Sequence, residues 1–432
     1  MSSKIVLVEH LARVEGHGGI TVEMQGDVIT DVQFNVLEGP RLLEALLHGK
    51  SYLQVAPILS RICAICSAAH TLTSLKATEA AFGVEVSPQT QRLRELLFRG
   101  ESIESHALHV FLLALPDYFH RPSAPALAAE QPEAVKLGLR LKQLGNTIQE
   151  LIGGRAIHPV NPVLGGMGHV PAVADLRALR DALERAQDEL RGAIDLLAAL
   201  PPDDFMEAET TYVAVEMRGE YAYYDAGDQL VVVSSNGRRR FSPAEYRLLT
   251  NEQSIAHSYA KHSTLDGEPF MVGALARLTV NRRRVSPAGT DAIARLGLVL
   301  PSSNPMDNNR AQAVELVMDL ERARELIEQS LDDGVRPERP VPVEPRAGVG
   351  TAVTEAPRGL LVHSYEYDGD GHVVSADVIT PTAMNAASVE RHFRETVAQS
   401  AQKDTPTLTR KLELIARAYD PCISCSVHLV RR

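Results

Sequence analysis

Asp420-Pro-Cys422-Ile-Ser-Cys425-Ser-Val-His428 stands near the end of this chain, and Arg61-Ile-Cys63-Ala-Ile-Cys66-Ser-Ala-Ala-His70 lies in its first quarter. Together these two stretches contain all 4 cysteines among the 432 residues. Each stretch spaces two thiols three residues apart and adds a histidine downstream. Four thiolates in one place favour a soft, thiolate-binding metal. We therefore expect a fold that brings the last turn of the chain onto its first quarter.

The spacing of the thiols admits several metals. Two cysteines at positions i and i+3 can bind one metal from a loop or a first helical turn, and thiolates favour zinc, iron–sulfur clusters, copper(I) or nickel. Structural zinc sites usually draw both cysteine pairs from one small domain. Here most of the chain separates the two pairs. The sequence therefore favours a core metal site that ties two ends of a large fold together, and structural zinc stays an alternative.

The cysteine count also bears on electron transfer. If all four cysteines serve one centre, none is left in this chain for an iron–sulfur relay, and electrons would leave through another subunit. Two glycine clusters, Gly165-Gly-Met-Gly168 and Gly348-Val-Gly350, do not complete the strand–GxGxxG–helix pattern of dinucleotide sites. We interpret both clusters as turns.

The composition is that of an ordinary globular protein, with 44% hydrophobic and 23% charged residues. A formal net charge of −11 without a basic patch argues against nucleic acid and anionic membranes as partners. No apolar run approaches the roughly 18 residues that a membrane helix needs. The first residues do not form the apolar core of a signal peptide. We therefore expect a cytoplasmic protein whose paired cysteines do metal or redox work.

Hydrophobic patterning predicts a mostly helical α+β fold, with a long-helix core and small flanking sheets. Long helices are predicted from about 90 to 200, with an amphipathic one over 175–200, and again over 308–331. The proline-rich segment 335–345 predicts an extended surface crossing. Other predicted helices are a short one opened by Pro40, one near 387–403 and one near 406–418, and predicted strands cover 4–9, 19–24, 28–36, parts of 210–235, 360–367 and 373–379.

We expect the whole chain, residues 1–432, to form one domain with three regions. A region of strands and the first cysteine pair covers 1–75, and a helical core covers about 76–334. A final region of strands, helices and the second cysteine pair covers 335–432.

The two cysteine motifs, with the residues that flank them, strongly resemble the signature motifs of the nickel–iron hydrogenase large (catalytic) subunit. Further elements of that family follow in the expected order: Arg13-Val-Glu15-Gly16-His17, Glu355-Ala-Pro357-Arg358-Gly359 and Thr380-Pro-Thr-Ala-Met-Asn385. Two further stretches most resemble the cytoplasmic, NAD(P)-linked branch that includes sulfhydrogenase alpha subunits. They are Ile103-Glu-Ser-His106-Ala-Leu-His109 and Arg155-Ala-Ile-His158. The resemblance implies the fold of that large subunit.

The resemblance implies a role for each cysteine. Cys63 and Cys422 would be terminal ligands of nickel. Cys66 and Cys425 would bridge the nickel to an iron that carries cyanide and carbon monoxide.

The resemblance also implies residues around this centre. Glu44 and His428 match the ligands of a nearby magnesium or iron site. His70 would donate a hydrogen bond to a bridging thiolate.

A third set of implied residues serves catalysis. Glu15, expected to be a buried carboxylate, matches the proton relay of the family. Arg358 matches a guanidinium held over the open face of the metal, and Pro357 would pack near the diatomic ligands. Asp420 would orient Arg358 through a charge-assisted pair.

One position departs from the family pattern. Many membrane-linked relatives place an aspartate near Arg358, and that position falls at Ser105 here. Whether Glu104 replaces this second carboxylate stays open at the level of the sequence.

The implied activity is reversible H2 oxidation and proton reduction. A small subunit with iron–sulfur clusters would take the electrons, and a flavin-containing diaphorase subunit would pass them to NAD(P). A maturation protease would remove Leu429–Arg432 after metal loading, because family precursors are commonly clipped behind the terminal histidine. Two alternatives stay beside this interpretation: a non-catalytic relative, such as a respiratory-complex scaffold or an H2 sensor, and a structural zinc protein.

Overall fold

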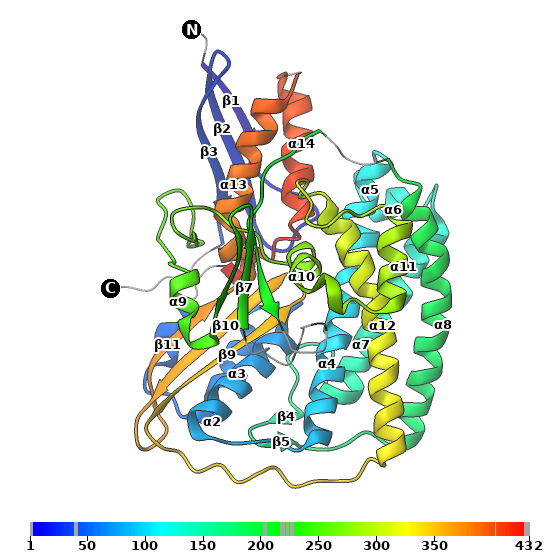
Figure 1. Ribbon diagram of the computed structural model, residues 1–432, viewed down its shortest axis with the longest axis vertical. Helices are drawn as coiled ribbons and strands as arrows, with labels where there is room; N and C mark the ends of the chain where they lie inside the picture. The colour runs from blue at the N-terminus through cyan, green and yellow to red at the C-terminus, as the bar shows by residue number, and fades with distance from the viewer. Residues whose placement is uncertain are drawn as a thin grey trace.

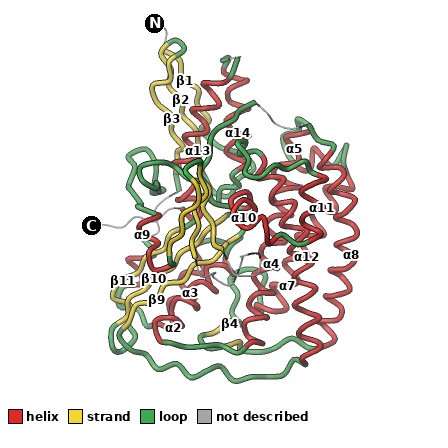
Figure 2. Tube along the Cα trace, in the orientation of Figure 1, coloured by secondary structure: helices red, strands yellow, loops and turns green. Residues whose placement is uncertain are grey.

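The computed structural model describes residues 3–38, 42–201, 205–216, 221, 224, 229–401 and 403–426. Long helices gather on one side of the molecule, and small antiparallel sheets with their covering helices form the other side (Figure 1, Figure 2). The predicted fold class, predominantly helical α+β, is confirmed.

The helical side is built from four long helices, which are α4 (Pro88–Ala107), α7 (Pro132–Gly153), α8 (Val173–Ala198) and α12 (Asp307–Asp333). α4 packs against α7 and α12, and α12 also packs against α8. α8 buries a stripe of leucines at helical spacing and exposes its charged face, as an amphipathic surface helix does. The helices predicted over 175–200 and 308–331 are therefore confirmed, within two residues at each end.

The central sheet consists of β9 (Gly348–Ala356), β10 (Gly359–Tyr367) and β11 (Val373–Ile379), with β10 in the middle. Ala356 pairs with Gly359, so the residues between them form the tight turn of the β9–β10 hairpin. α3 (Ser67–Phe82) packs on β9 and β10. The approach is close: a Cβ added to Gly350 would lie 2.0 Å from Ala77 O and 2.5 Å from Ala81 N. Glycine at this position allows helix and sheet to touch.

The other sheets are small. β1 (Ser3–Val8), β2 (Gly18–Gln25) and β3 (Val28–Val36) form an antiparallel meander beside α13 and α14 (Figure 1). These strands confirm the three predicted near the N-terminus. β6 (Tyr212–Glu216), β7 (Gln229–Ser234) and β8 (Gly237–Phe241) form another antiparallel sheet, and β4 (Pro162–Val163) pairs with β5 (Gly166–Met167).

Shorter helices and turns connect these parts. They are α1 (Leu43–Leu47), α2 (Tyr52–Leu59), η1 (Ser60–Ile62), the π-helical η2 (Leu108–Ala114), α5 (Leu115–Tyr118), α6 (Ala124–Leu127), η3 (Pro243–Glu245), α9 (Tyr246–Leu249), α10 (Ala274–Asn281), η4 (Arg282–Arg284), α11 (Pro287–Arg295), α13 (Pro381–Gln399), α14 (Thr405–Ala418) and α15 (Ile423–Ser426).

The sequence prediction missed α2, α9, α10 and α11, and it missed two further helical stretches for one shared reason. α3 has no counterpart among the predicted elements, and α13 begins at Pro381 and not near residue 387. α3 is buried on nearly every face, and the first residues of α13, Pro381–Ala386, are all buried. A helix enclosed on all sides carries no amphipathic pattern to read.

Other predictions have mixed outcomes. The segment predicted as a helical core, 76–334, also holds β4 to β8, and β8 has no alternating apolar pattern because it reads Gly-Arg-Arg-Arg-Phe. The segment 335–345 has no regular structure and is mostly exposed, which confirms the predicted crossing (Figure 1). Pro40 lies outside the described residues, and α1 follows it. Among the described helices, none is both long and apolar enough to cross a bilayer.

Replacing Gly350 by alanine should lower the thermal unfolding midpoint. The new methyl group would overlap the backbone of α3, and overpacking of a core costs about 1–3 kcal/mol. Gly369→Ala is the matched control, because nothing lies within 4 Å of a Cβ there. Circular dichroism during heating measures both variants. Equal midpoints for the two variants would contradict the close contact between α3 and β9.

Candidate metal centre

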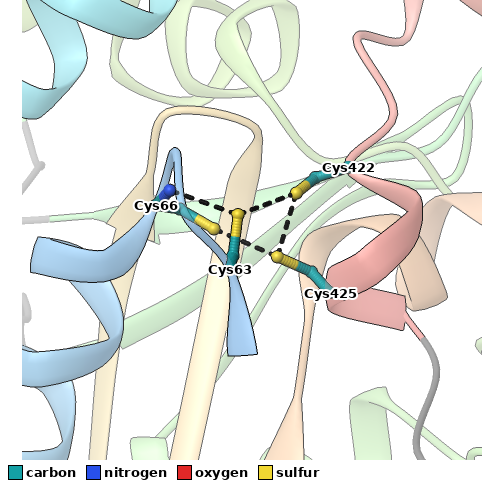
Figure 3. A group of neighbouring side chains, drawn as sticks. All are labelled: Cys63, Cys66, Cys422 and Cys425. Carbon is teal, nitrogen blue, oxygen red and sulfur yellow. Dashed lines mark hydrogen bonds between the residues drawn. The ribbon is translucent and has the colours of Figure 1, made fainter. Parts of the chain in front are cut away.

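The four cysteine side chains meet in the interior of the protein (Figure 3). Cys63 Sγ lies 3.1 Å from Cys422 Sγ, and Cys66 Sγ lies 3.0 Å from Cys425 Sγ. Cys422 Sγ and Cys425 Sγ are also 3.0 Å apart. These distances exceed the roughly 2.05 Å of a disulfide bond, and all four cysteines are free thiols that are buried to at least nine-tenths. The structure thus brings the two distant pairs into one group.

Each thiol of the first pair is placed by the end of a helix. Cys63 follows the turn η1, and Cys66 is the N-cap of α3. Their spacing lets Cys66 N donate a hydrogen bond to Cys63 Sγ at 3.3 Å. In the second pair, Cys425 lies in α15, and Cys422 N donates to Thr382 Oγ1 of α13 at 3.0 Å.

An N-terminal loop closes over the second pair. Glu15 forms a parallel β-bridge with Cys422, and Ile423 N donates to Glu15 O at 2.9 Å. Gly16 has a φ of 85°, in the left-handed region that favours glycine. A Cβ at Gly16 would lie 2.8 Å from Ile423 Cβ. Glycine is therefore required where the two ends of the chain touch.

The thiols do not ionise alike. Burial raises the pKa of Cys66, Cys422 and Cys425 well above the ordinary value of a thiol. Burial acts on Cys63 as well, but hydrogen bonds from the other three thiols and the charge of Arg358 outweigh it and lower the pKa of Cys63. A soft cation that binds the four sulfurs as thiolates would offset part of the buried negative charge. The donor set therefore fits a thiolate-bound metal.

Arg358 lies in the tight turn between β9 and β10. Its Nη2 donates to Asp420 Oδ1 at 3.0 Å, and its Nε donates to Asp420 O at 2.9 Å. Burial disfavours the charge, but Asp420 and the neighbouring cysteines outweigh burial and raise the pKa of Arg358 well above its usual range. The guanidinium is thus held charged beside the sulfurs.

Ser105 supplies the third contact of this guanidinium. Arg358 Nη1 donates to Ser105 Oγ at 3.2 Å. Glu104, the acid whose role the sequence left open, instead forms an ion pair with Lys142 Nζ at 2.6 Å. A hydroxyl therefore stands in the structure where many membrane-linked relatives are expected to have an aspartate.

Buried Arg277 holds the turn that carries Arg358. It donates to Ala356 O at 2.9 Å and to Pro357 O at 2.8 Å. Arg277 forms an ion pair with Glu315 at 2.6 Å. Burial alone would raise the pKa of Glu315, but the charge and hydrogen bonds of Arg277 outweigh burial and lower this pKa to about 2. No sequence pattern indicates this role, because Arg277 and Glu315 belong to different helices, α10 and α12, that are separated along the chain.

Glu15 contacts the second cysteine pair directly. Its Oε2 accepts hydrogen bonds from Ser424 N at 3.0 Å and from Cys422 Sγ at 3.2 Å. The sequence led us to expect a buried carboxylate, but Glu15 is half-buried. It therefore reaches from a buried thiol to the protein surface.

His70 begins a chain of buried polar groups. Its Nδ1 lies 3.1 Å from His363 Nε2, and His363 Nδ1 contacts the hydroxyl of Tyr365. That hydroxyl donates to Ser74 Oγ at 3.2 Å. The expected hydrogen bond from His70 to a bridging thiolate stays a prediction.

Glu44 has one carboxylate oxygen without a hydrogen bond from the described residues, and it lines a large cavity. Its Oε1 accepts from Val378 N at 2.8 Å, whereas its Oε2 is buried without a hydrogen-bond partner among the described residues. Lys261 Nζ lies 4.0 Å from that oxygen. The cavity, of about 1160 Å³, is also lined by Glu252 and Asp377. His428, the other ligand expected here, lies outside the described residues.

Two residues beside the first cysteine pair have positions that the sequence did not predict. Glu101 is fully buried, and its carboxylate accepts from Ala68 N at 2.6 Å and Ala69 N at 2.9 Å, at the start of α3. His158 adopts a left-handed conformation and donates from its backbone N to Ser67 Oγ at 2.9 Å. Glu101 stands four residues after the buried Leu97, so an acid on the apolar face of α4 was the available signal.

Comparisons with known proteins point to one family. A family profile described as nickel-dependent hydrogenase matches residues 41–151 and 203–428. Sulfhydrogenase 1 subunit alpha of Pyrococcus furiosus is 39% identical over 99% of this chain and 98% of its own length. Sulfhydrogenase 2 subunit alpha of the same organism is 36% identical over 99% of this chain and 100% of its own length.

A solved structure agrees with the sequence comparisons. The crystal structure of an NAD+-reducing NiFe-hydrogenase in the H2-reduced state has a TM-score of 0.88 with this fold. The match covers 98% of this chain and 99% of the other, at 26% sequence identity.

Replacing Cys66 by serine should leave the purified chain with well under one metal ion at this centre. A hydroxyl is a much weaker ligand than a thiolate for a soft metal. Thr71→Ala, on the next turn of α3, is the control, because that hydroxyl donates only within its own helix, to Ser67 O at 2.7 Å. Elemental analysis gives the metal content, and circular dichroism checks the fold. A folded serine variant with full metal content would overturn the assignment of Cys66 as a ligand.

Proposed function

The chain belongs to the nickel-dependent hydrogenase family, and we propose that its four cysteines hold a nickel–iron centre. The protein is an oxidoreductase, the catalytic subunit that oxidises H2 and reduces protons. We assign Cys63 and Cys422 to nickel, and Cys66 and Cys425 to bridges between nickel and iron. One observation supports the assignment most: ligand atoms from both ends of the chain lie within 4.8 Å of one another in a buried group. Such a centre, when bound, acts as a Lewis acid that acidifies H2 and exchanges its electrons.

Proton transfer falls to the residues of the chain. Cys422 Sγ and Glu15 Oε2 are 3.2 Å apart, within reach for direct proton transfer. A proton held on that sulfur can pass to the Glu15 carboxylate, which is half-buried and so has access to the surface. Reduction of protons uses the same two atoms in the opposite direction.

Arg358 provides a fixed positive charge beside the centre. Asp420 orients it through two hydrogen bonds, and Ser105 holds the remaining arm. A charge that is already in place stabilises thiolates without reorganisation during the reaction. We assign Pro357, in the same turn, to packing near the cyanide and carbon monoxide ligands of the iron, and His70 to the outer shell of a bridging thiolate.

A second metal site fits around Glu44. Magnesium and iron accept carboxylate oxygens as ligands, and Glu44 Oε2 is buried without a hydrogen-bond partner among the described residues. Burial raises the pKa of Glu44, so that a cation would also stabilise its charged form. We assign His428 as a further ligand by resemblance alone.

The electrons need another subunit. All 4 cysteines are taken by the proposed centre, so this chain has no thiolates left for an iron–sulfur relay. The similar sulfhydrogenases are named as alpha subunits, and one similar structure is NAD+-reducing. We therefore propose a small subunit with iron–sulfur clusters and a flavin-containing diaphorase that reduces NAD(P), in the cytoplasm. A maturation protease that removes Leu429–Arg432 completes the proposed set of partners.

Metal analysis combined with infrared spectroscopy tests the proposed centre. The purified complex should contain about one nickel per chain and show cyanide and carbonyl bands, together with H2-dependent reduction of an artificial acceptor. Stoichiometric zinc without such bands would identify a structural zinc protein. A loaded nickel–iron centre without H2 turnover would identify a sensor or scaffold. Either of the latter results overturns the proposal.

Glu15→Gln should keep the metals and lose catalysis. An amide cannot take the proton from Cys422, and the loss of a positioned proton acceptor lowers rates by about 10²–10⁴-fold. Glu38→Gln is the control, because Glu38 lies in the same N-terminal region but pairs with His17, at 2.7 Å. H2 oxidation and exchange of D2 with solvent protons measure both variants. Full activity of Glu15→Gln would refute the proposed proton path.

A further inference from the structure

A second cluster of metal-binding side chains lies apart from the cysteines. His257 and His262 come from the loop that follows α9, and Glu390 comes from α13. His257 Nε2 lies 2.7 Å from Glu390 Oε1, and His262 Nδ1 lies 3.7 Å from Glu390 Oε2. The two imidazoles thus approach different oxygens of one carboxylate, and ligand atoms from all three residues lie within 4.8 Å of one another.

His262 is not satisfied by the protein atoms around it. Its side chain is 8% exposed, and its Nε2 is buried without a hydrogen-bond partner among the described residues. The 3.7 Å between Nδ1 and Glu390 is longer than a hydrogen bond. Burial and the charge of His257 lower the pKa of His262 to about 4. His262 Nδ1 is the ring nitrogen that faces the carboxylate of Glu390, and it lies too far away to be held by a hydrogen bond to that group.

The backbone holds the three residues in place. Gln253 and His262 exchange two backbone hydrogen bonds, of 2.8 and 2.9 Å. Tyr259 N donates to Val36 O at 3.1 Å, which ties the loop to β3. Phe34 N, also of β3, donates to Glu390 Oε1 at 2.8 Å. The loop, the strand and the helix are thus joined around the cluster before any ion binds.

The donor set suits zinc. Two histidines and one carboxylate form a common zinc site with an open fourth position. Zinc bonds of about 2.0–2.1 Å in a tetrahedron place neighbouring ligand atoms about 3.3 Å apart, and the two observed distances, 2.7 and 3.7 Å, lie on either side of that value. We propose that His257, His262 and Glu390 bind one zinc ion, with water as the fourth ligand. His257 borders a surface cavity of about 400 Å³ that gives water access.

This site is separate from the one proposed at Glu44. Lys261 Nζ contacts Glu252 at 2.6 Å and lies 4.0 Å from Glu44. The next residue, His262, is in an extended pair with Gln253 and faces Glu390. Successive side chains of extended backbone point to opposite sides. A zinc ion at His262 would therefore fasten the segment that carries Lys261 without contacting Glu44, and it would stabilise the junction of the loop, β3 and α13.

Zinc binding by the mature complex tests the proposal, because its cysteines are already occupied by the resident centre. The complex is treated with a chelator, and ZnCl2 is then added in competition with a coloured zinc indicator. Unmodified complex should bind one zinc more than the His262→Ala variant, whose affinity at this site should fall at least about 100-fold. Zinc K-edge absorption should show nitrogen and oxygen neighbours only.

His372→Ala is the matched control. His372 Nδ1 also lies 3.7 Å from a carboxylate, that of Asp368, but no second histidine joins it in a metal-binding group of the described residues. This variant should bind zinc like the unmodified complex. His257→Ala, which removes a less buried ligand, keeps the test decisive if His262→Ala does not fold. Equal zinc binding by all variants, no added zinc in the unmodified complex, or sulfur neighbours of zinc would each overturn the proposal.

Discussion

The meeting of two thiol pairs from opposite ends of the chain is the constraint on which the rest of the fold depends. No covalent bond joins them, since all four cysteines are free. Close backbone contact holds the two ends together instead. The backbone N of Ile423 donates a hydrogen bond to Glu15 O, and Gly16 leaves room for the fully buried Ile423 side chain. On the other side, α3 presses against β9 and β10 and fixes the first pair. The four sulfurs are therefore buried and held close together by the fold.

The buried charges near the centre contribute more to the placement of the β9–β10 turn than to the stability of the fold. Removing ions from water is costly, and a buried ion pair seldom improves on well-packed apolar residues. Arg277 nevertheless forms a fully buried pair with Glu315 and also bonds the carbonyl groups of the β9–β10 turn. That turn carries Arg358, whose own partner, Asp420, lies two residues before Cys422. Through these charges, the turn is aligned with the second cysteine motif.

The segment around residues 252–262 links the neighbourhood of Glu44 to helix α13. On one side, Lys261 connects Glu252 to the neighbourhood of Glu44. On the other side, His262 faces Glu390 of α13, the helix that also contacts Cys422 through Thr382. This segment therefore contacts the helix that also holds Cys422, but it contributes no ligand to the cysteine centre. The polar contacts on its two sides give this irregular stretch a defined position.

The sequence by itself determined the thiolate donor set and the large amphipathic helices. The two CxxC motifs identify thiolates as the metal-binding groups. The buried stripe of α8 can be recognised in the sequence because the opposite face of this helix is exposed to solvent and polar. The family resemblance added roles for Glu15 and Arg358. Only the tertiary structure decided where α3 runs, how Ser105 and not Glu104 meets Arg358, and that Glu101 and Arg277 support the site. The physical reason is that hydrophobic periodicity in the sequence reflects which face of an element is exposed to water. The partner of a buried polar group depends instead on how the fold places residues that are far apart in the chain.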